Sequence, residues 1–215
     1  LIYLACILII GLPIMMAEIV IGRRASSSPV NSMKSAALDS NRSSNWQLIG
    51  WGGLVAGILI LSFYSVLAGI CINYIFISVL PDLQLSSEDQ FSITTSSASN
   101  LLIWHTIFIF ITAGVIASGI KNGIGRFVRV LMPLLGFILI LMVLNAVING
   151  DFLKGLQFLF RPDFSQVNPQ TFLSAMGQAF FSLSLGMGAI MTYGAYMSDD
   201  QKILNTSITV GGLDT

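Results

Sequence analysis

Charged residues are scarce in this chain, and their scarcity excludes an ordinary soluble fold. Only 9% of the 215 residues are Asp, Glu, Lys or Arg, whereas 54% are hydrophobic. An average soluble domain carries about 25% charged residues, so this chain has too few charges to cover a water-exposed surface. Its net charge is zero and its basic residues are scattered, which argues against a nucleic-acid partner.

Histidine and cysteine are also rare, which removes most metal and nucleophile chemistry. The single histidine is His105, and no Cys/His/Glu cluster has the spacing of zinc ligands. A serine hydrolase needs a base beside its nucleophile, and His105 lies near the end of an apolar segment. We therefore expect that the protein is not an enzyme and that His105 is a packed or interfacial residue. Cys6 and Cys71 fall inside apolar runs, where buried free thiols are expected instead of a disulfide.

Long apolar runs are what the sequence has in abundance. A run of about 20 apolar residues has the length that crosses the hydrocarbon core of a bilayer. The pattern predicts an all-α polytopic membrane protein embedded in the lipid bilayer. We expect one transmembrane domain over residues 1–215, incomplete at both ends, because the first run begins at residue 1. The five runs are Leu1–Val20, Leu54–Leu80, Leu101–Ser118, Val128–Ile148 and Phe172–Met197.

The basic residues predict how the chain is oriented. Short cytoplasmic loops of membrane proteins carry an excess of Lys and Arg. Eight basic residues fall in one set of loops, and only Lys154 and Arg161 fall in the other. The loops that contain Arg23, Lys121 and Lys202 are therefore expected to be cytoplasmic, in a multi-pass protein of the plasma membrane.

Three polar segments connect the apolar runs. The segment Pro81–Asn100 is rich in Ser and Thr and is expected to be a solvated external loop. The segment Gly150–Thr171 mixes aromatic residues with prolines and is expected to form short interfacial pieces. The segment Ala25–Ser44 is polar and could hold a short surface helix.

Glu18 is an acidic residue near the end of the first run, in GLPIMMAEIVIGRR. A carboxylate within a membrane is costly and usually faces the interior of the helix bundle. The alternative is that Glu18 lies close enough to the interface to be hydrated and paired with Arg23 or Arg24. The sequence leaves both interpretations open.

Tyr64 places a hydroxyl in the middle of the second run. It shares one helical stripe with Gly57, Ile60 and Ala68, and small residues allow another helix to approach closely. A buried tyrosine hydroxyl needs a partner. That partner could be a neighbouring backbone group or a polar ligand.

The segment AFFSLSLGMGAIMTYGAYM, from Ala179 to Met197, is apolar but has two hydroxyls and two glycines at its centre. Glycine costs a helix interior about 1 kcal/mol relative to alanine. Irregular backbone at membrane depth occurs where it is buried in protein or lines a cavity, and transporters use such interrupted helices to bind ions and substrates. Close helix packing through small residues is the alternative.

This segment closely resembles the sixth helix of the sodium:neurotransmitter symporter family. The rest of the chain is similar to the same family in order: GLPIMMAEIVIGRR to the end of its second helix, SFYSVLAG to its third, GIKNGIGRFVRVLMPLL to its second internal loop and fifth helix, and LQFLFRPDF to its third external loop. The resemblance implies a two-times-five-helix inverted-repeat transporter in which helices one and six are unwound. The chain would hold helices two to six and the start of seven.

The resemblance also implies roles for individual residues. Asp214 is expected on the first turn of helix seven as a sodium ligand, unless it merely caps that helix. The matching substrate and ion positions are Phe181 as an aromatic lid, Ser182 as a hydroxyl ligand of sodium beside the substrate, Ser184 and Met187 as walls of the side-chain pocket, Tyr64 as the partner of the substrate carboxylate, and Ile60 as a pocket wall.

These roles imply sodium-coupled symport of a neutral, hydrophobic amino acid by alternating access in a prokaryotic membrane. Sodium is the implied cofactor, the amino acid is the implied small-molecule partner, and a homodimer is left open. Because Asp214 would supply negative charge at the ion, transport is expected to be independent of chloride. Two alternatives stay open: a sodium-independent amino-acid exchanger of the same general fold, and a non-transporting membrane scaffold.

Overall fold

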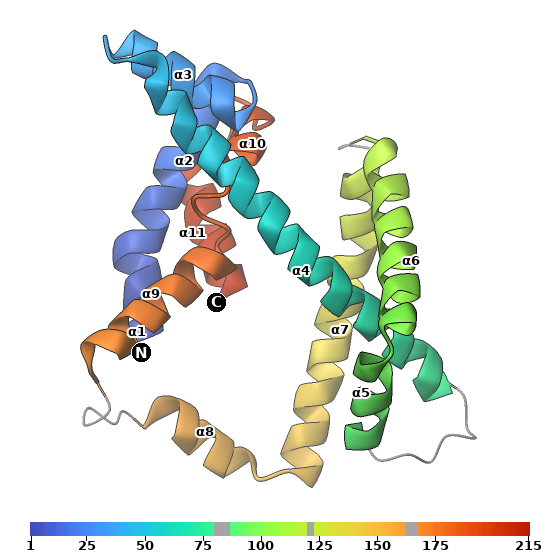
Figure 1. Ribbon diagram of the computed structural model, residues 1–215. Helices are drawn as coiled ribbons and strands as arrows, with labels where there is room; N and C mark the ends of the chain where they lie inside the picture. The colour runs from blue at the N-terminus through green and yellow to red at the C-terminus, as the bar shows by residue number, and fades with distance from the viewer. Residues whose placement is uncertain (80–86, 120–122, 162–166) are drawn as a thin grey trace. The chain divides into compact units, whose positions relative to one another are not determined.

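The computed structural model describes residues 1–79, 87–119, 123–161 and 167–215, and the regular elements in these ranges are helices (Figure 1). The chain divides into two compact units. The first comprises Leu1–Ile58 and Leu156–Thr215, and the second comprises Leu59–Gly155.

The chain begins with one helical run over Ile2–Ala25. It consists of α1 (Ile2–Cys6), a π-helical turn η1 (Ile7–Gly11) and α2 (Leu12–Ala25). Pro13 has no backbone N–H and cannot donate to the carbonyl of residue 9. The backbone N–H of Leu12, directly before it, bonds the carbonyl of Ile7, which is the wide i→i+5 spacing of a π turn. The proline therefore accounts for the irregularity, and the helix continues beyond it.

Two short helices follow α2, and the first of them lies in the polar segment that was expected to be able to hold a short surface helix. They are α3 (Pro29–Asp39) and the 3₁₀ turn η2 (Ser44–Trp46), and α4 (Gln47–Val79) begins directly afterwards. A surface ion pair joins Arg24 to Asp39, with 3.1 Å between nitrogen and oxygen.

The last apolar run is not one helix. It forms α9 (Pro169–Ser182) and α10 (Ala189–Ala195), separated by an irregular stretch, and α11 (Ile203–Asp214) follows. The side chain of Asn168 accepts a hydrogen bond of 2.8 Å from the backbone N–H of Thr171, which caps α9 at its start.

The core of the first unit lies between the helices of the first run and α9, and α10 packs against α2. Two glycines allow the α2–α10 contact: a Cβ on Gly22 would lie 2.0 Å from the carbonyl oxygen of Met191, and a Cβ on Gly194 would lie 2.7 Å from that of Ile19. Only glycine at both positions lets the two backbones approach this closely. The buried apolar residues of the core are Cys6, Ile7, Met15, Ile19, Ala179, Leu183 and Leu185.

The second unit contains the remainder of α4 together with α5 (Ser87–Ser96), α6 (Ala98–Ala117), α7 (Gly125–Asn149) and the start of α8 (Phe152–Phe160). The prediction of a loop over residues 81–100 was therefore wrong where the structure describes this segment, because α5 and the first turn of α6 lie within it. The short helix α8 falls where interfacial pieces were expected.

One face of α4 packs against α5 and α6. A Cβ on Gly69 would lie 2.7 Å from the backbone nitrogen of His105, and the amide of Asn73 donates a hydrogen bond of 3.3 Å to the Thr94 hydroxyl. His105 is half-buried in this packing, as predicted. Cys6 is a buried free thiol, but Cys71 is exposed, which contradicts the prediction, because it lies on the opposite face of α4.

Four helical runs in the described ranges are long and apolar enough to cross a membrane. The first four predicted runs each correspond to one of them, whereas the fifth is interrupted between α9 and α10. The four are Ile2–Ala25, Ser44–Ile77, Ala98–Ala117 and Gly125–Asn149.

Candidate functional site

The backbone between α9 and α10 leaves the helical conformation at three alternate residues. Ser184, Gly186 and Gly188 have φ angles of 54°, 80° and 77°, in the left-handed region that disfavours residues with a side chain. A Cβ on Gly186 would meet no atom within 4 Å. Close packing therefore does not explain this glycine, and the interrupted helix predicted from the sequence is confirmed.

The break exposes the ends of two helices. The last backbone bonds of α9 include the N–H of Leu183 to the carbonyl of Ala179 at 3.1 Å and the N–H of Leu185 to that of Phe180 at 2.9 Å. Gly188 precedes the first residue of α10, and its carbonyl accepts a hydrogen bond of 3.0 Å from the backbone N–H of Thr192. The C-terminal end of α9 carries the partial negative charge of the helix dipole, which favours a cation.

Ser182 and Asp214, the two predicted sodium ligands, lie in contact at this break. The Ser182 hydroxyl, on the last residue of α9, donates a hydrogen bond to Oδ2 of Asp214. Asp214, however, does not lie on the first turn of its helix. It lies 11 residues beyond Ile203, the residue at which α11 begins. The expectation for its place was wrong, and so was the alternative that it caps the N-terminus of that helix, because the turn after α10 is short.

Glu18 faces the same break from α2. Its side chain is buried, and Oε1 accepts a hydrogen bond of 2.7 Å from the backbone N–H of Gly186. The alternative in which Glu18 pairs with Arg23 or Arg24 was wrong, because both arginines form ion pairs with aspartates elsewhere. The carboxylate thus satisfies a backbone donor that the unwound stretch leaves without a helical partner.

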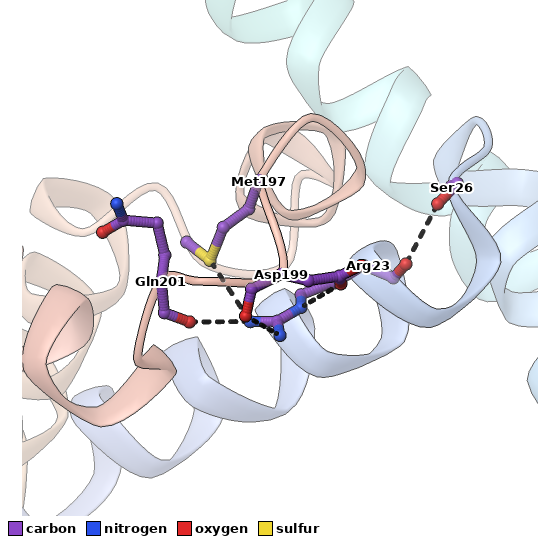
Figure 2. Close-up of polar contacts among 5 residues, drawn as sticks. All are labelled: Arg23, Ser26, Met197, Asp199 and Gln201. Carbon is purple, nitrogen blue, oxygen red and sulfur yellow. Dashed lines mark hydrogen bonds and ion pairs between the residues drawn. The ribbon is translucent and has the colours of Figure 1, made fainter.

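Arg23, one turn beyond Glu18, holds the segment between α10 and α11 (Figure 2). Its guanidinium donates to the carbonyls of Asp199 at 3.0 Å and Gln201 at 2.8 Å, and Nε lies 3.5 Å from the Asp199 carboxylate. The sulfur of Met197 lies 4.0 Å from the same guanidinium. The loop after α2 and the loop after α10 therefore lie at the same end of the first unit.

Two further residues at the break were not singled out from the sequence. A Cβ on Gly53, near the start of α4, would lie 2.9 Å from the carbonyl oxygen of Gly186, so α4 passes directly against the unwound backbone. Pro29, the first residue of α3, is buried against Gly188. The Gly52-Gly53 pair in the sequence indicates that another segment can approach α4 closely here. It does not indicate which segment that is, because the partner depends on the tertiary structure.

The other predicted residues divide between the two units. Ser184 and Met187 are half-buried in the unwound stretch, and Phe181 is exposed on the last turn of α9. Ile60 and Tyr64 lie on the part of α4 that belongs to the second unit. There the ring of Tyr64 packs edge-on against that of Phe63, with 5.9 Å between centroids. Among the residues used for orientation, Lys121 lies outside the described residues.

An interrupted helix with oxygen-bearing side chains at the break, among helices of membrane length, is typical of secondary transporters. The family model of the sodium:neurotransmitter symporter family matches residues 83–215. The chain belongs to this family. The predicted resemblance is thereby confirmed, and the family is one of transporters and not of enzymes, as predicted.

Individual relatives agree with the family assignment. The chain is 31% identical to an uncharacterized sodium-dependent transporter of Haemophilus influenzae, covering 100% of this chain and 49% of the relative. It is 32% identical to one of Bacillus subtilis, covering 98% and 47%. The crystal structure of MhsT in complex with L-phenylalanine is 40% identical, with a TM-score of 0.89 over 99% of this chain and 48% of that protein. The chain thus spans about half the length of these relatives, which agrees with the predicted fragment of an inverted-repeat transporter.

Proposed function

We propose that the full-length protein is a sodium-coupled symporter of a neutral, hydrophobic amino acid. The observation that carries the proposal is the contact between Ser182 and Asp214 at the break between α9 and α10. It places a hydroxyl and a carboxylate, from segments 32 residues apart, beside the C-terminal end of a half-helix. The family assignment supports the dependence on sodium.

The donor set fits a sodium ion. Transporters coordinate Na⁺ through unwound carbonyls and the C-terminal ends of half-helices, and Ser182 and Asp214 add a hydroxyl and a carboxylate oxygen at the end of α9. Asp214 would add a full negative charge beside the ion. Bound sodium would provide the positive charge that holds α9 and α11 together at this point.

The residues around the break suit an amino acid with an apolar side chain. We assign Phe181 to a lid and Ser184 and Met187 to the walls of a pocket; for Ile60, the role of a pocket wall rests on the family resemblance alone. Methionine is flexible and polarizable, so a pocket that contains Met187 can adapt to side chains of different shape. MhsT was crystallised in complex with L-phenylalanine, which supports an amino-acid substrate of this kind.

The proposed orientation places the loops with Arg23, Lys121 and Lys202 in the cytoplasm. The hydrogen bonds from Arg23 to the carbonyls of Asp199 and Gln201 support a common side for the first and the last of these loops. The excess of Lys and Arg in this set of loops then favours the cytoplasmic side.

Amino-acid uptake by the full-length protein in proteoliposomes tests the function. We expect uptake in sodium that is lost when choline or potassium replaces it, with no effect of chloride. Asp214→Asn should lower the apparent sodium affinity at least about tenfold. Asparagine keeps an oxygen ligand but removes the charge, and two unit charges about 4 Å apart interact by roughly 4 kcal/mol at an effective dielectric constant near 20.

Asp151→Asn is the matched control, because this exposed carboxylate pairs only with Lys154 among the described residues. The sodium-site assignment fails if Asp214→Asn keeps the sodium affinity of the parent and chloride has no effect on either protein. Uptake that persists without sodium would favour the exchanger, and binding of the amino acid without accumulation would favour the scaffold.

A further inference from the structure

A groove of about 560 Å³ runs between α6 and α7 in the second unit. Its walls are mostly apolar side chains, with two glycines, one serine and one charged residue. The residues that define it are Phe110, Gly114 and Val115 on α6 and Arg126, Phe127 and Val130 on α7. None of them belongs to the ion and substrate site proposed above.

The length of the groove matches one leaflet of a bilayer. The groove extends along α6 from Phe110 to Ser118, the residue at which the helix ends. Eight residues of helix rise about 12 Å, and half of a typical hydrocarbon core is about 15 Å. The groove therefore begins at a helix end and extends about as deep as one acyl chain in a single leaflet.

A positive charge lies at the helix-end side of the groove. Arg126 is the second residue of α7 and its side chain is exposed. Among the described residues, no carboxylate forms an ion pair with it. The N-terminal end of a helix of 25 residues adds partial positive charge at the same place. An anionic group at the mouth of the apolar groove would therefore lie beside the positive charge of Arg126.

We propose that this groove binds one anionic phospholipid of the bilayer, with an acyl chain along α6 and α7 and the phosphate on Arg126. Basic pockets between transmembrane helices are a known way to bind anionic headgroups. The apolar walls favour a lipid over a free phosphate, which would gain nothing from them. Gly114 makes room for the chain, because a Cβ there would meet no atom within 4 Å.

Two variants of the full-length protein test the two halves of this site. Native mass spectrometry of protein released from mixed phosphatidylglycerol and phosphatidylcholine membranes measures the retained lipid. Arg126→Gln should reduce the preference for phosphatidylglycerol about fivefold, as expected for one basic residue near an anionic surface. Gly114→Leu fills the groove from α6 and should reduce retention of both lipids.

Each control variant makes the same type of substitution at a position outside the groove. Arg129→Gln removes a charge from the same helix outside the groove, and Gly136→Leu adds the same side chain at a position of α7 that also has open space. Both should retain lipid as the parent does. Glycerol phosphate should not displace the lipid, because it lacks the chain.

The proposal is overturned if Arg129→Gln lowers the preference as much as Arg126→Gln, if a folded Gly114→Leu retains lipid like the parent, or if glycerol phosphate competes. Should Gly114→Leu fail to fold, the comparison of the two arginine variants still decides. Lipid retention is measured without transport, so its outcome is independent of the proposed symport.

Discussion

At the scale of single residues, the break depends on glycine at two positions with left-handed backbone. Gly186→Ala should destabilise the full-length protein by about 1–2 kcal/mol, the cost of this conformation for a residue with a Cβ. Gly188→Ala should cost more, because its Cβ would also lie 2.8 Å from Pro29. Thermal unfolding of the purified variants measures both effects.

Gly136→Ala provides the control, since this glycine is helical and has open space around its Cβ position. Alanine is the better helix former there, so stability should stay equal or rise slightly. If Gly186→Ala were as stable as Gly136→Ala, residue 186 would not have a left-handed backbone conformation in the protein.

Glu18 acts through one backbone hydrogen bond. Glu18→Ala removes the acceptor of the Gly186 N–H and should cost about 1.5–3 kcal/mol, the range for a hydrogen bond to a charged group. Glu18→Gln keeps a carbonyl oxygen that can accept the same bond and should recover part of the loss. Thermal unfolding of the two variants distinguishes the bond from simple packing. An equal loss in both would contradict the role of the acceptor.

At the scale of elements, α10 is too short to be stable alone. It has seven residues, whereas isolated helices shorter than about 12–15 residues are marginal in water. Its stability comes from α2, which it meets through Gly22 and Gly194, and from Arg23 at its end. The contacts with α2 and Arg23 are therefore expected to contribute to the stability of α10.

Arg23→Lys tests this contact. Lysine keeps the charge but lacks the planar fork that reaches two carbonyls together. With one hydrogen bond lost, the backbone amides of residues 198–202 should exchange with deuterium about 2–13 times faster, as expected for about 0.5–1.5 kcal/mol. Arg24→Lys is the control, because it alters only an exposed ion pair with Asp39. Unchanged exchange in Arg23→Lys would mean that the arginine does not hold the loop.

At the scale of the whole molecule, we propose that Tyr64 binds the substrate carboxylate. In the full-length protein, Tyr64→Phe should weaken substrate binding by about 1.5–3 kcal/mol, because the phenol donates to a charged group. Isothermal titration with the transported amino acid measures the change. Tyr74→Phe on the same helix should leave the affinity unaltered, and an unaltered affinity in Tyr64→Phe would remove this residue from the site.

Membrane character, helix content and the place of the break were predictable from the sequence alone. Each follows from a local property: apolar runs match the bilayer thickness, and Gly186 and Gly188 adopt a backbone that other residues avoid. The family was also readable from the motif around Ser182. The tyrosine, serine and aspartate roles remain predictions, since they require substrate and ion.

Only the tertiary structure decided what these residues face. The sequence left Glu18 open between a nearby arginine and the bundle interior, and the fold places its carboxylate on the N–H of Gly186, 168 residues away. It likewise puts Asp214 well beyond the first turn of α11 and in contact with Ser182. Pairings between segments so distant in the chain depend on how the helices pack, and local composition carries no signal of the segment that lies opposite.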